Sequence, residues 1–133
     1  MCIRDRSVTA AINSIKIINK NKNKMYAKLE RNCELLTSEI DDLATDHKIP
    51  HQINSIASMF QVFFSSKPVT DYKTSKKADG KKFNKLFANL LKNGVFIAPS
   101  QFESVFLSDA HTDVDITKTL GAYGLSLLSL IHI

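Results

Sequence analysis

Apolar residues recur at intervals of three and four over two stretches in the first third of the chain. Residues 8–18 predict a short helix, and residues 25–46 predict a longer amphipathic one. Between them, residues 20–24 alternate lysine with asparagine, which we interpret as a polar linker or an exposed helix end. The longer apolar stripe consists of Tyr26, Leu29, Cys33, Leu36, Ile40 and Leu43. It spans fewer than the three or four heptads of a coiled coil, so we expect it to face the core.

Two short strands follow, at residues 52–56 and 59–64, and they fit one hairpin with Ala57 and Ser58 at the bend. In the second strand, large apolar side chains fall on both alternating faces. We therefore expect a sheet that is covered on both sides, either by helices of this chain or by a domain outside it.

A third helix is expected to end at Gly94, because a glycine just past the last apolar position is the usual left-handed stop. Its apolar positions are Phe83, Leu86, Phe87, Leu90 and Leu91. The lysines between residues 73 and 85 precede or alternate with this pattern, so we interpret them as its solvent-facing side. The preceding residues 71–79 predict a polar loop or a short helix.

The run after Gly94 passes from an apolar segment into a polar turn. Residues 95–97 predict a buried strand, which Pro99 ends because proline cannot donate to a sheet ladder. Ser100, Gln101 and Glu103 then form a loop before a second apolar run at residues 105–107. A carboxylate displayed at this point is the one feature of the sequence that suggests a chemical role.

Thr112 and Asp115 have the spacing of a capping box, although aspartate replaces the usual Glu or Gln. They introduce a final amphipathic helix with its apolar positions at Ile116, Leu120, Tyr123 and Leu127. The expected order is helix, helix, strand, strand, helix, strand, strand, helix. That order predicts an α+β fold, with helices packed on a small, mainly antiparallel sheet.

Composition places the 133-residue chain among globular proteins, since 44% of it is hydrophobic and its apolar runs are far too short to span a bilayer. The net charge of +5 is too mild to indicate nucleic-acid binding. Cys33 falls on the core-facing stripe and Cys2 lies at the extreme N-terminus, so we expect neither a disulfide nor a cysteine metal site. This pattern fits a reducing, cytoplasmic setting. His47 and His51 are too isolated for a metal site.

Both ends of the chain look foreign to the rest. Residues 1–5 (MCIRD) and 128–133 (LSLIHI) are what the two orientations of a common transposase end sequence encode. We therefore expect residues 1–6 and 128–133 to be sequencing-adapter scars, and residues 7–127 to be the natural segment, cut from a longer protein.

Three motifs carry a resemblance to a known family. The runs GVFIAPSQFE at residues 94–103, NSIASMF at residues 54–60 and AHTD at residues 110–113 resemble the C-terminal part of the glutamate-1-semialdehyde 2,1-aminomutases. These are pyridoxal-phosphate enzymes of tetrapyrrole synthesis, related to the class III aminotransferases. The resemblance runs from about Ser7 to about Leu127, and it departs from the family at Ala57, where glycine is usual.

The resemblance implies the small C-terminal domain of a fold-type I pyridoxal-phosphate enzyme that converts glutamate-1-semialdehyde to 5-aminolevulinate. In that family the Schiff-base lysine and the other cofactor groups lie upstream, in a large domain of a homodimer. The segment should therefore be inactive alone, with pyridoxal 5'-phosphate bound by the missing large domain. No residue of it is expected to be catalytic, to bind the cofactor or to hold a metal, and neither nucleic acid nor membrane is an expected partner.

The resemblance places Glu103 beside the substrate, where related aminotransferases generally have an arginine that grips a carboxylate. The aminomutase reaction passes through a diamine, so an acid near a free ammonium makes electrostatic sense. Ser100 and Gln101 are less certain substrate contacts, because their side chains could instead bond the loop backbone. From the residues alone, Glu103 could equally cap or salt-bridge its loop, and His111 reads as a surface or capping residue.

Two other readings stay open. One is another class III aminotransferase, and the other is a non-catalytic α+β binding module.

Overall fold

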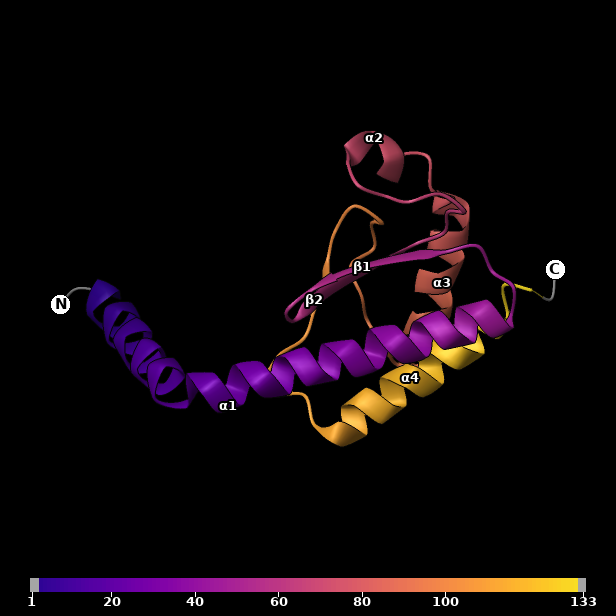
Figure 1. The fold of residues 1–133 in the computed structure, drawn as a ribbon. Helices are drawn as coiled ribbons and strands as arrows, with labels where there is room; N and C mark the ends of the chain where they lie inside the picture. The colour runs from indigo at the N-terminus through magenta and orange to yellow at the C-terminus, as the bar shows by residue number, and fades with distance from the viewer. Residues whose placement is uncertain (1–2, 132–133) are drawn as a thin grey trace.

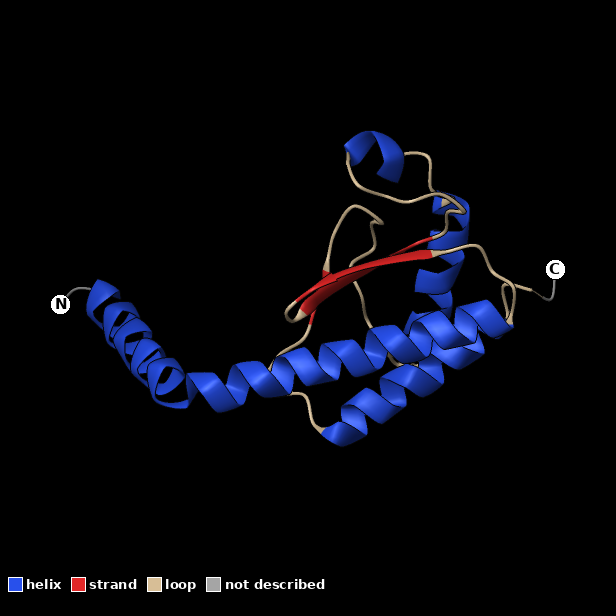
Figure 2. Cartoon of the chain, viewed as in Figure 1, coloured by secondary structure: helices blue, strands red, loops and turns tan. Residues whose placement is uncertain are grey.

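Helix α1 (Ile3–Asp46) is the longest element of the structure, a computed structural model that describes residues 3–131. It is followed by β1 (Gln52–Ile56), β2 (Met59–Phe63), α2 (Tyr72–Ser75), α3 (Gly80–Lys92), β3 (Val105–Phe106) and α4 (Asp113–Leu128). Figures 1 and 2 show α4 lying along the second half of α1, with the sheet on the other side of α1. The arrangement confirms the predicted α+β class, with helices packed on a small antiparallel sheet.

The first half of α1 projects away from the rest of the molecule, as Figure 1 shows. The predicted linker or helix end at residues 20–24 is wrong, because α1 runs through this segment without a break. Neither glycine nor proline occurs within α1, and lysine is a good helix former. Asn21 donates its side-chain amide to the carbonyl oxygen of Ile17 at 3.1 Å. Residues 4–24 are all exposed, so no packing among the described residues supports this half of the helix.

The second half of α1 supplies much of the core. Cys33, Leu36 and Ile40 are at most 2% exposed, and they share one apolar cluster with residues of α4 and the sheet. Each large side chain buried in this way contributes ~1.5–3 kcal/mol of hydrophobic stabilisation. The predicted stripe begins too early, since Tyr26 is 55% exposed and Leu29 is only half-buried.

The sheet has the order β1-β2-β3, with both pairs antiparallel. The predicted hairpin is confirmed, and its bend at Ala57 and Ser58 aligns Ile56 with Met59. Ala57 has φ 52°, the left-handed region in which the absence of a Cβ favours glycine. The family glycine at this position therefore has a structural reason.

The predicted strand at residues 95–97 is absent. The backbone N–H of Val95 instead donates to the carbonyl oxygen of Leu90 at 2.9 Å, which closes the end of α3. Gly94 has φ 80°, so the predicted left-handed helix stop is confirmed. Residues 95–97 cannot pair with β2, because β1 already pairs with one edge of β2 and β3 with the other. Ile97 is buried by side-chain packing alone.

The expectation of a sheet covered on both sides holds for β2 and fails at the tip of the sheet. Phe60 and Val62 face the main core, while Phe63 packs with Val69 and Ala78 on the opposite face. Ile56 is 69% exposed, and Phe106 is 65% exposed.

The predicted start of the last helix and the predicted short helix before α3 are both present. Thr112 and Asp115 form the expected capping box at the start of α4, where the N–H of Thr112 donates to the Asp115 carboxylate at 2.8 Å. Residues 71–79 contain the short helix α2, and Asp79 then caps α3 by accepting from the N–H groups of Lys81 and Lys82. None of the helices described is long and apolar enough to cross a membrane.

Candidate functional site

The turn at residues 100–103 holds Glu103 at the surface. Its backbone closes on itself, because the N–H of Glu103 donates to the carbonyl oxygen of Ser100 at 3.1 Å. The hydroxyl oxygen of Ser100 accepts from the N–H of Phe102 at 3.2 Å. In the structure Ser100 therefore bonds its own loop, the alternative that the sequence favoured for it.

Gln101 attaches this turn to two regular elements. Its carbonyl oxygen accepts from the side-chain amide of Gln61 on β2 at 2.8 Å. Its own side chain lies against Gly80, the first residue of α3, where an added Cβ would meet the amide at 3.6 Å. The side-chain oxygen of Gln101 is buried and has no hydrogen-bond partner among the residues described.

The Glu103 side chain is exposed, and its carboxylate makes no hydrogen bond or ion pair within residues 3–131. The structure therefore gives no support to the alternative in which Glu103 salt-bridges its loop. Beside it, the half-exposed ring of Phe102 lies 5.8 Å from that of Tyr72, centroid to centroid. The turn thus combines a fixed backbone with a free negative charge.

The residues that fix this turn were missed by the sequence analysis. Gln61 is 6% exposed, and it was seen only as one position of an apolar strand. A glutamine within an otherwise apolar strand is a detectable signal in the sequence, because a buried polar side chain needs a hydrogen-bond partner. The role of Gly80 could not be read in advance, since it depends on α3 approaching a loop about twenty residues further along.

The lysines near the turn are solvent-facing, as predicted. Lys73, Lys76, Lys77, Lys81 and Lys85 are exposed, and Lys82 is half-buried. The ammonium of Lys76 lies 5.4 Å from the ring centroid of Tyr72. An open pocket beside the turn is bordered by Lys76, Lys81, Asn84 and Ser100.

The described residues do not fit pyridoxal phosphate. That cofactor needs a lysine for its Schiff base, an acid at the pyridine nitrogen and donors for the phosphate. No lysine among residues 3–131 is buried, and half-buried Lys28 already donates to the carbonyl oxygen of Asp109 at 2.7 Å. Within the same residues, no three potential metal ligands come together.

The histidines have local roles. His51 contacts the Asp41 carboxylate through Nε2 at 2.9 Å and the carbonyl oxygen of Ile49 through Nδ1 at 2.8 Å. His111 is half-buried and accepts from the N–H of Ser108 through Nδ1 at 3.0 Å, a bond within the turn before α4, whose cap is Thr112.

Comparison with curated proteins identifies close relatives. Over 124 residues the chain is 67% identical to the glutamate-1-semialdehyde 2,1-aminomutase of Nitrosopumilus maritimus, a match that covers 93% of this chain and 29% of that protein. It is 50% identical over 121 residues to the glutamate-1-semialdehyde 2,1-aminomutase 1 of Cenarchaeum symbiosum, covering 91% and 29%. The chain thus spans less than a third of the curated relatives it matches. A scan against protein-family models finds no match.

Solved structures show the same fold. The FumI protein of Sphingopyxis sp. MTA144, in a PLP internal aldimine form, matches 92% of this chain and 26% of its own, with a TM-score of 0.73 and 26% identity. A β-phenylalanine aminotransferase from Variovorax paradoxus matches 77% of this chain and 23% of its own, with a TM-score of 0.69 and 24% identity. The matched region is the C-terminal part of such enzymes.

Proposed function

We propose, from the homology of this chain to the glutamate-1-semialdehyde 2,1-aminomutases, that it forms the small C-terminal domain of such an enzyme. The complete enzyme would convert glutamate-1-semialdehyde to 5-aminolevulinate in tetrapyrrole biosynthesis, as a cytoplasmic homodimer. The observation that carries the proposal is the 67% identity to a curated aminomutase over 93% of the chain. Pyridoxal phosphate would be held by the part of the enzyme outside this chain, so the chain alone would be inactive.

Glu103 would contribute a fixed negative charge to the active site of that enzyme. Its carboxylate is exposed and has no partner in the described residues, so it is free to accept hydrogen bonds from an ammonium group. The substrate's amino group changes carbon atoms during an aminomutase reaction, and a nearby carboxylate would hold it in place while it does so. Glu103 would thus bind and orient the substrate without bonding to the cofactor.

Ser100 and Gln101 would position Glu103 rather than contact the substrate strongly. Both use polar atoms to hold the turn, Ser100 through its hydroxyl and Gln101 through its carbonyl oxygen. A carboxylate on a turn anchored to β2 and α3 loses less conformational entropy on binding than one on a free loop.

A second candidate is another class III aminotransferase, because solved structures of a transaminase and of a β-phenylalanine aminotransferase have the same fold as this chain. The two candidates differ at residue 103, because an aminotransferase of that class would be expected to grip a substrate carboxylate with an arginine here. The acidic side chain favours the aminomutase.

A chimeric enzyme tests the proposal. The part of the Nitrosopumilus maritimus relative that aligns with residues 7–127 would be replaced by these residues, because we also propose that residues 1–6 and 128–133 derive from sequencing adapters. Formation of 5-aminolevulinate from glutamate-1-semialdehyde is then measured. Activity near that of the unaltered relative is expected, whereas a folded, cofactor-loaded chimera that aminates other ketones but makes no 5-aminolevulinate would favour the second candidate.

The charge of Glu103 is tested in the same chimera by Glu103→Gln, which keeps the shape of the side chain. A hydrogen bond to a charged group is worth about 1.5–3 kcal/mol, which corresponds to a roughly 10- to 150-fold loss in kcat/KM. Cofactor absorbance should not change. Glu39→Gln removes an exposed carboxylate from α1 and serves as the matched control, with wild-type kinetics expected.

Two results would count against this role. Wild-type kinetics in the Glu103→Gln enzyme would reduce Glu103 to a loop residue. Loss of cofactor binding would show that it belongs to the cofactor site instead.

A further inference from the structure

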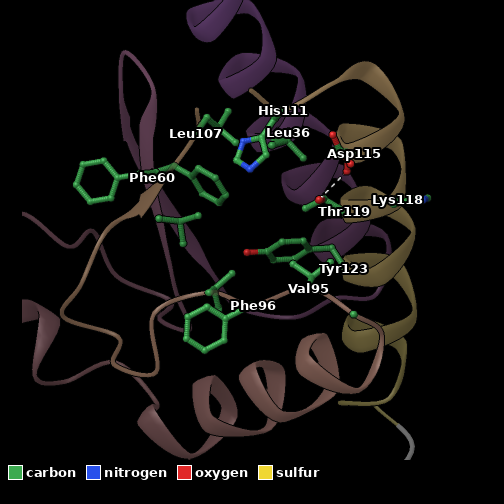
Figure 3. A pocket seen from close by; sticks show the side chains of 14 residues that line it. Leu36, Phe60, Val95, Phe96, Leu107, His111, Asp115, Lys118, Thr119 and Tyr123 are labelled. Carbon is green, nitrogen blue, oxygen red and sulfur yellow. Dashed lines mark hydrogen bonds between the residues drawn. The ribbon is translucent and has the colours of Figure 1, made fainter. Parts of the chain in front are cut away.

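A cavity of about 260 Å³ lies between the sheet and α4, and no residue of the Ser100–Glu103 turn lines it (Figure 3). Its walls are mainly apolar and come from separate parts of the chain: Leu36 of α1, Phe60 of β2, Val105 of β3 and Val95 after α3. The segment that contains Val95 forms no ladder with the sheet. It passes the sheet as a loop, and the space between this loop, β3 and α4 is left open.

The hydroxyl of Tyr123 points into this cavity, as Figure 3 shows. Tyr123 is only 1% exposed, and the small accessible surface that it keeps is where it lines the cavity. Burial raises the pKa of Tyr123 above its usual value, so the side chain is a neutral phenol that can both donate and accept. A ligand that covered this hydroxyl without a hydrogen bond would incur a desolvation cost, so a ligand that offers it a partner is favoured.

A second polar group faces the same space from the opposite side. Figure 3 shows the His111 ring across the cavity from Tyr123. Because Nδ1 of His111 accepts from the N–H of Ser108, the neutral ring carries its proton on Nε2, which is therefore a donor.

The other polar side chains at the cavity are already engaged or turned away. Thr119 donates its hydroxyl to the carbonyl oxygen of Asp115 at 2.8 Å, and the Asp115 carboxylate is held by the helix cap. Lys118 points away from the cavity in Figure 3. The cavity therefore offers one donor, one group that can donate or accept, and no cation.

We propose that this cavity binds a small neutral phenol, with the ligand's hydroxyl between Tyr123 and His111 and its ring against Phe60 and Val95. A phenol's oxygen can accept from Nε2–H of His111 while its proton is donated to the Tyr123 oxygen, so both protein groups are satisfied. An apolar cavity of about 150 Å³ is enough to hold benzene. The larger volume here leaves room for the hydroxyl and a water. Two exposed rings, Phe96 and Phe106, add aromatic surface to its lining.

Other occupants fit less well. A carboxylate would enter without a facing cation, in surroundings that disfavour charge enough to raise the pKa of Tyr123. A purely apolar ring would fill the volume and leave the Tyr123 hydroxyl unsatisfied. Ordered water alone would also form a hydrogen bond with the Tyr123 hydroxyl. The titration described next distinguishes water from a bound ligand.

Nuclear magnetic resonance titration of the 133-residue chain provides the test, with phenol, toluene and benzoate as probes. Phenol is expected to bind with a dissociation constant of about 1 mM or tighter, and to shift the resonances of Tyr123, His111 and Val95. Toluene has the same size without the hydroxyl, so it should bind roughly fivefold to tenfold more weakly. Benzoate should bind least. Equal affinities for phenol and toluene would overturn the proposal, and so would shifts confined to other parts of the chain.

Two variants locate the binding. Tyr123→Phe keeps the ring and removes the hydroxyl, so phenol should lose roughly fivefold to tenfold in affinity while toluene binding is unchanged. Val95→Trp fills the cavity from the loop, and it should abolish binding of both probes while the dispersed spectrum of the folded chain remains. Phenol affinity that is the same in both variants as in the wild type would overturn the proposal. The absence of any phenol binding at about 10 mM would also overturn it, and would leave ordered water as the occupant.

Discussion

Ala57 is strained, because its backbone lies in the left-handed region that favours glycine. It turns the β1-β2 hairpin with φ 52°, and a left-handed conformation costs an L-residue about 1–2 kcal/mol. Ala57→Gly should remove this cost and restore some chain entropy to the unfolded state, for a net gain of about 0.5–1 kcal/mol in the free energy of unfolding. Urea unfolding of the chain measures the difference.

Ala110→Gly is the matched control for that variant. Ala110 is exposed in a turn and its φ is not positive, so glycine there should only destabilise, by a few tenths of a kcal/mol. If both variants lowered the free energy of unfolding equally, the bend at Ala57 would not be strained.

Burial of Tyr123 should make the free energy of unfolding depend on pH in the alkaline range. The folded-state pKa of Tyr123 is raised by desolvation, while its unfolded value is about 10. The group's contribution is therefore complete below pH ~10 and is lost as the pH rises toward the folded pKa, by about 1.4 kcal/mol per pH unit. Tyr123→Phe lacks this ionisation, so its free energy of unfolding should fall less steeply above pH 10. Parallel wild-type and variant curves up to pH 11.5 would contradict a raised pKa.

The sequence located the displayed carboxylate of Glu103 but could not show how it is held. Proline and the polar residues around it predict a loop, but they do not indicate which elements the loop packs against. The hydrogen bond from Gln61 to Gln101 joins residues forty positions apart, so it depends on the fold. Short-range features were accessible, as the capping box at Thr112 and the glycine stop at Gly94 show.

At the scale of elements, hydrophobic periodicity identified the buried faces of α1, α3 and α4, although Tyr26 and Leu91 of the predicted stripes are exposed. It failed where burial is absent or needs no regular structure. The first half of α1 is helical although nothing packs on it in residues 3–131, and it contains no proline or glycine that would break it. Residues 95–97 form an apolar run in which Ile97 is buried, and a buried strand would have the same sequence pattern. In the structure this segment pairs with no strand, because both edges of β2 are occupied and it does not extend the sheet at β1 or β3.

The two halves of α1 should therefore differ in what they contribute to stability. Deleting residues 1–24 should change the free energy of unfolding by less than about 0.5 kcal/mol, because residues 4–24 are all exposed. Ile40→Ala, in the buried half, should cost about 2–5 kcal/mol. Urea unfolding followed by circular dichroism compares them. A loss above about 1 kcal/mol in the truncated chain would reveal contacts of the N-terminal half that the structure does not contain.

At the scale of the whole molecule, exposed aromatic side chains are concentrated in one segment of the chain, and two of them, Phe96 and Phe106, line the same cavity. Phe96, Phe102 and Phe106 are 73%, 53% and 65% exposed, and all three lie within eleven residues that include the Glu103 turn. Apolar side chains exposed together often mark a surface that contacts another protein or domain. This agrees with the proposal that the turn works against a part of the enzyme that lies outside the chain.

The chain by itself should not form a stable complex with pyridoxal phosphate. A lysine that forms a lasting Schiff base is activated by burial or by a neighbouring charge, which lowers its pKa. Here Lys28 and Lys82 are only half-buried and every other lysine among residues 3–131 is exposed, so adducts should be weak and spread over many sites. Mixing the purified chain with the cofactor should give a visible absorbance band that dialysis removes. A band that survives dialysis and disappears in one variant, Lys82→Ala or Lys28→Ala, would show a cofactor site within this chain and would overturn the proposed division of labour between the two parts of the enzyme.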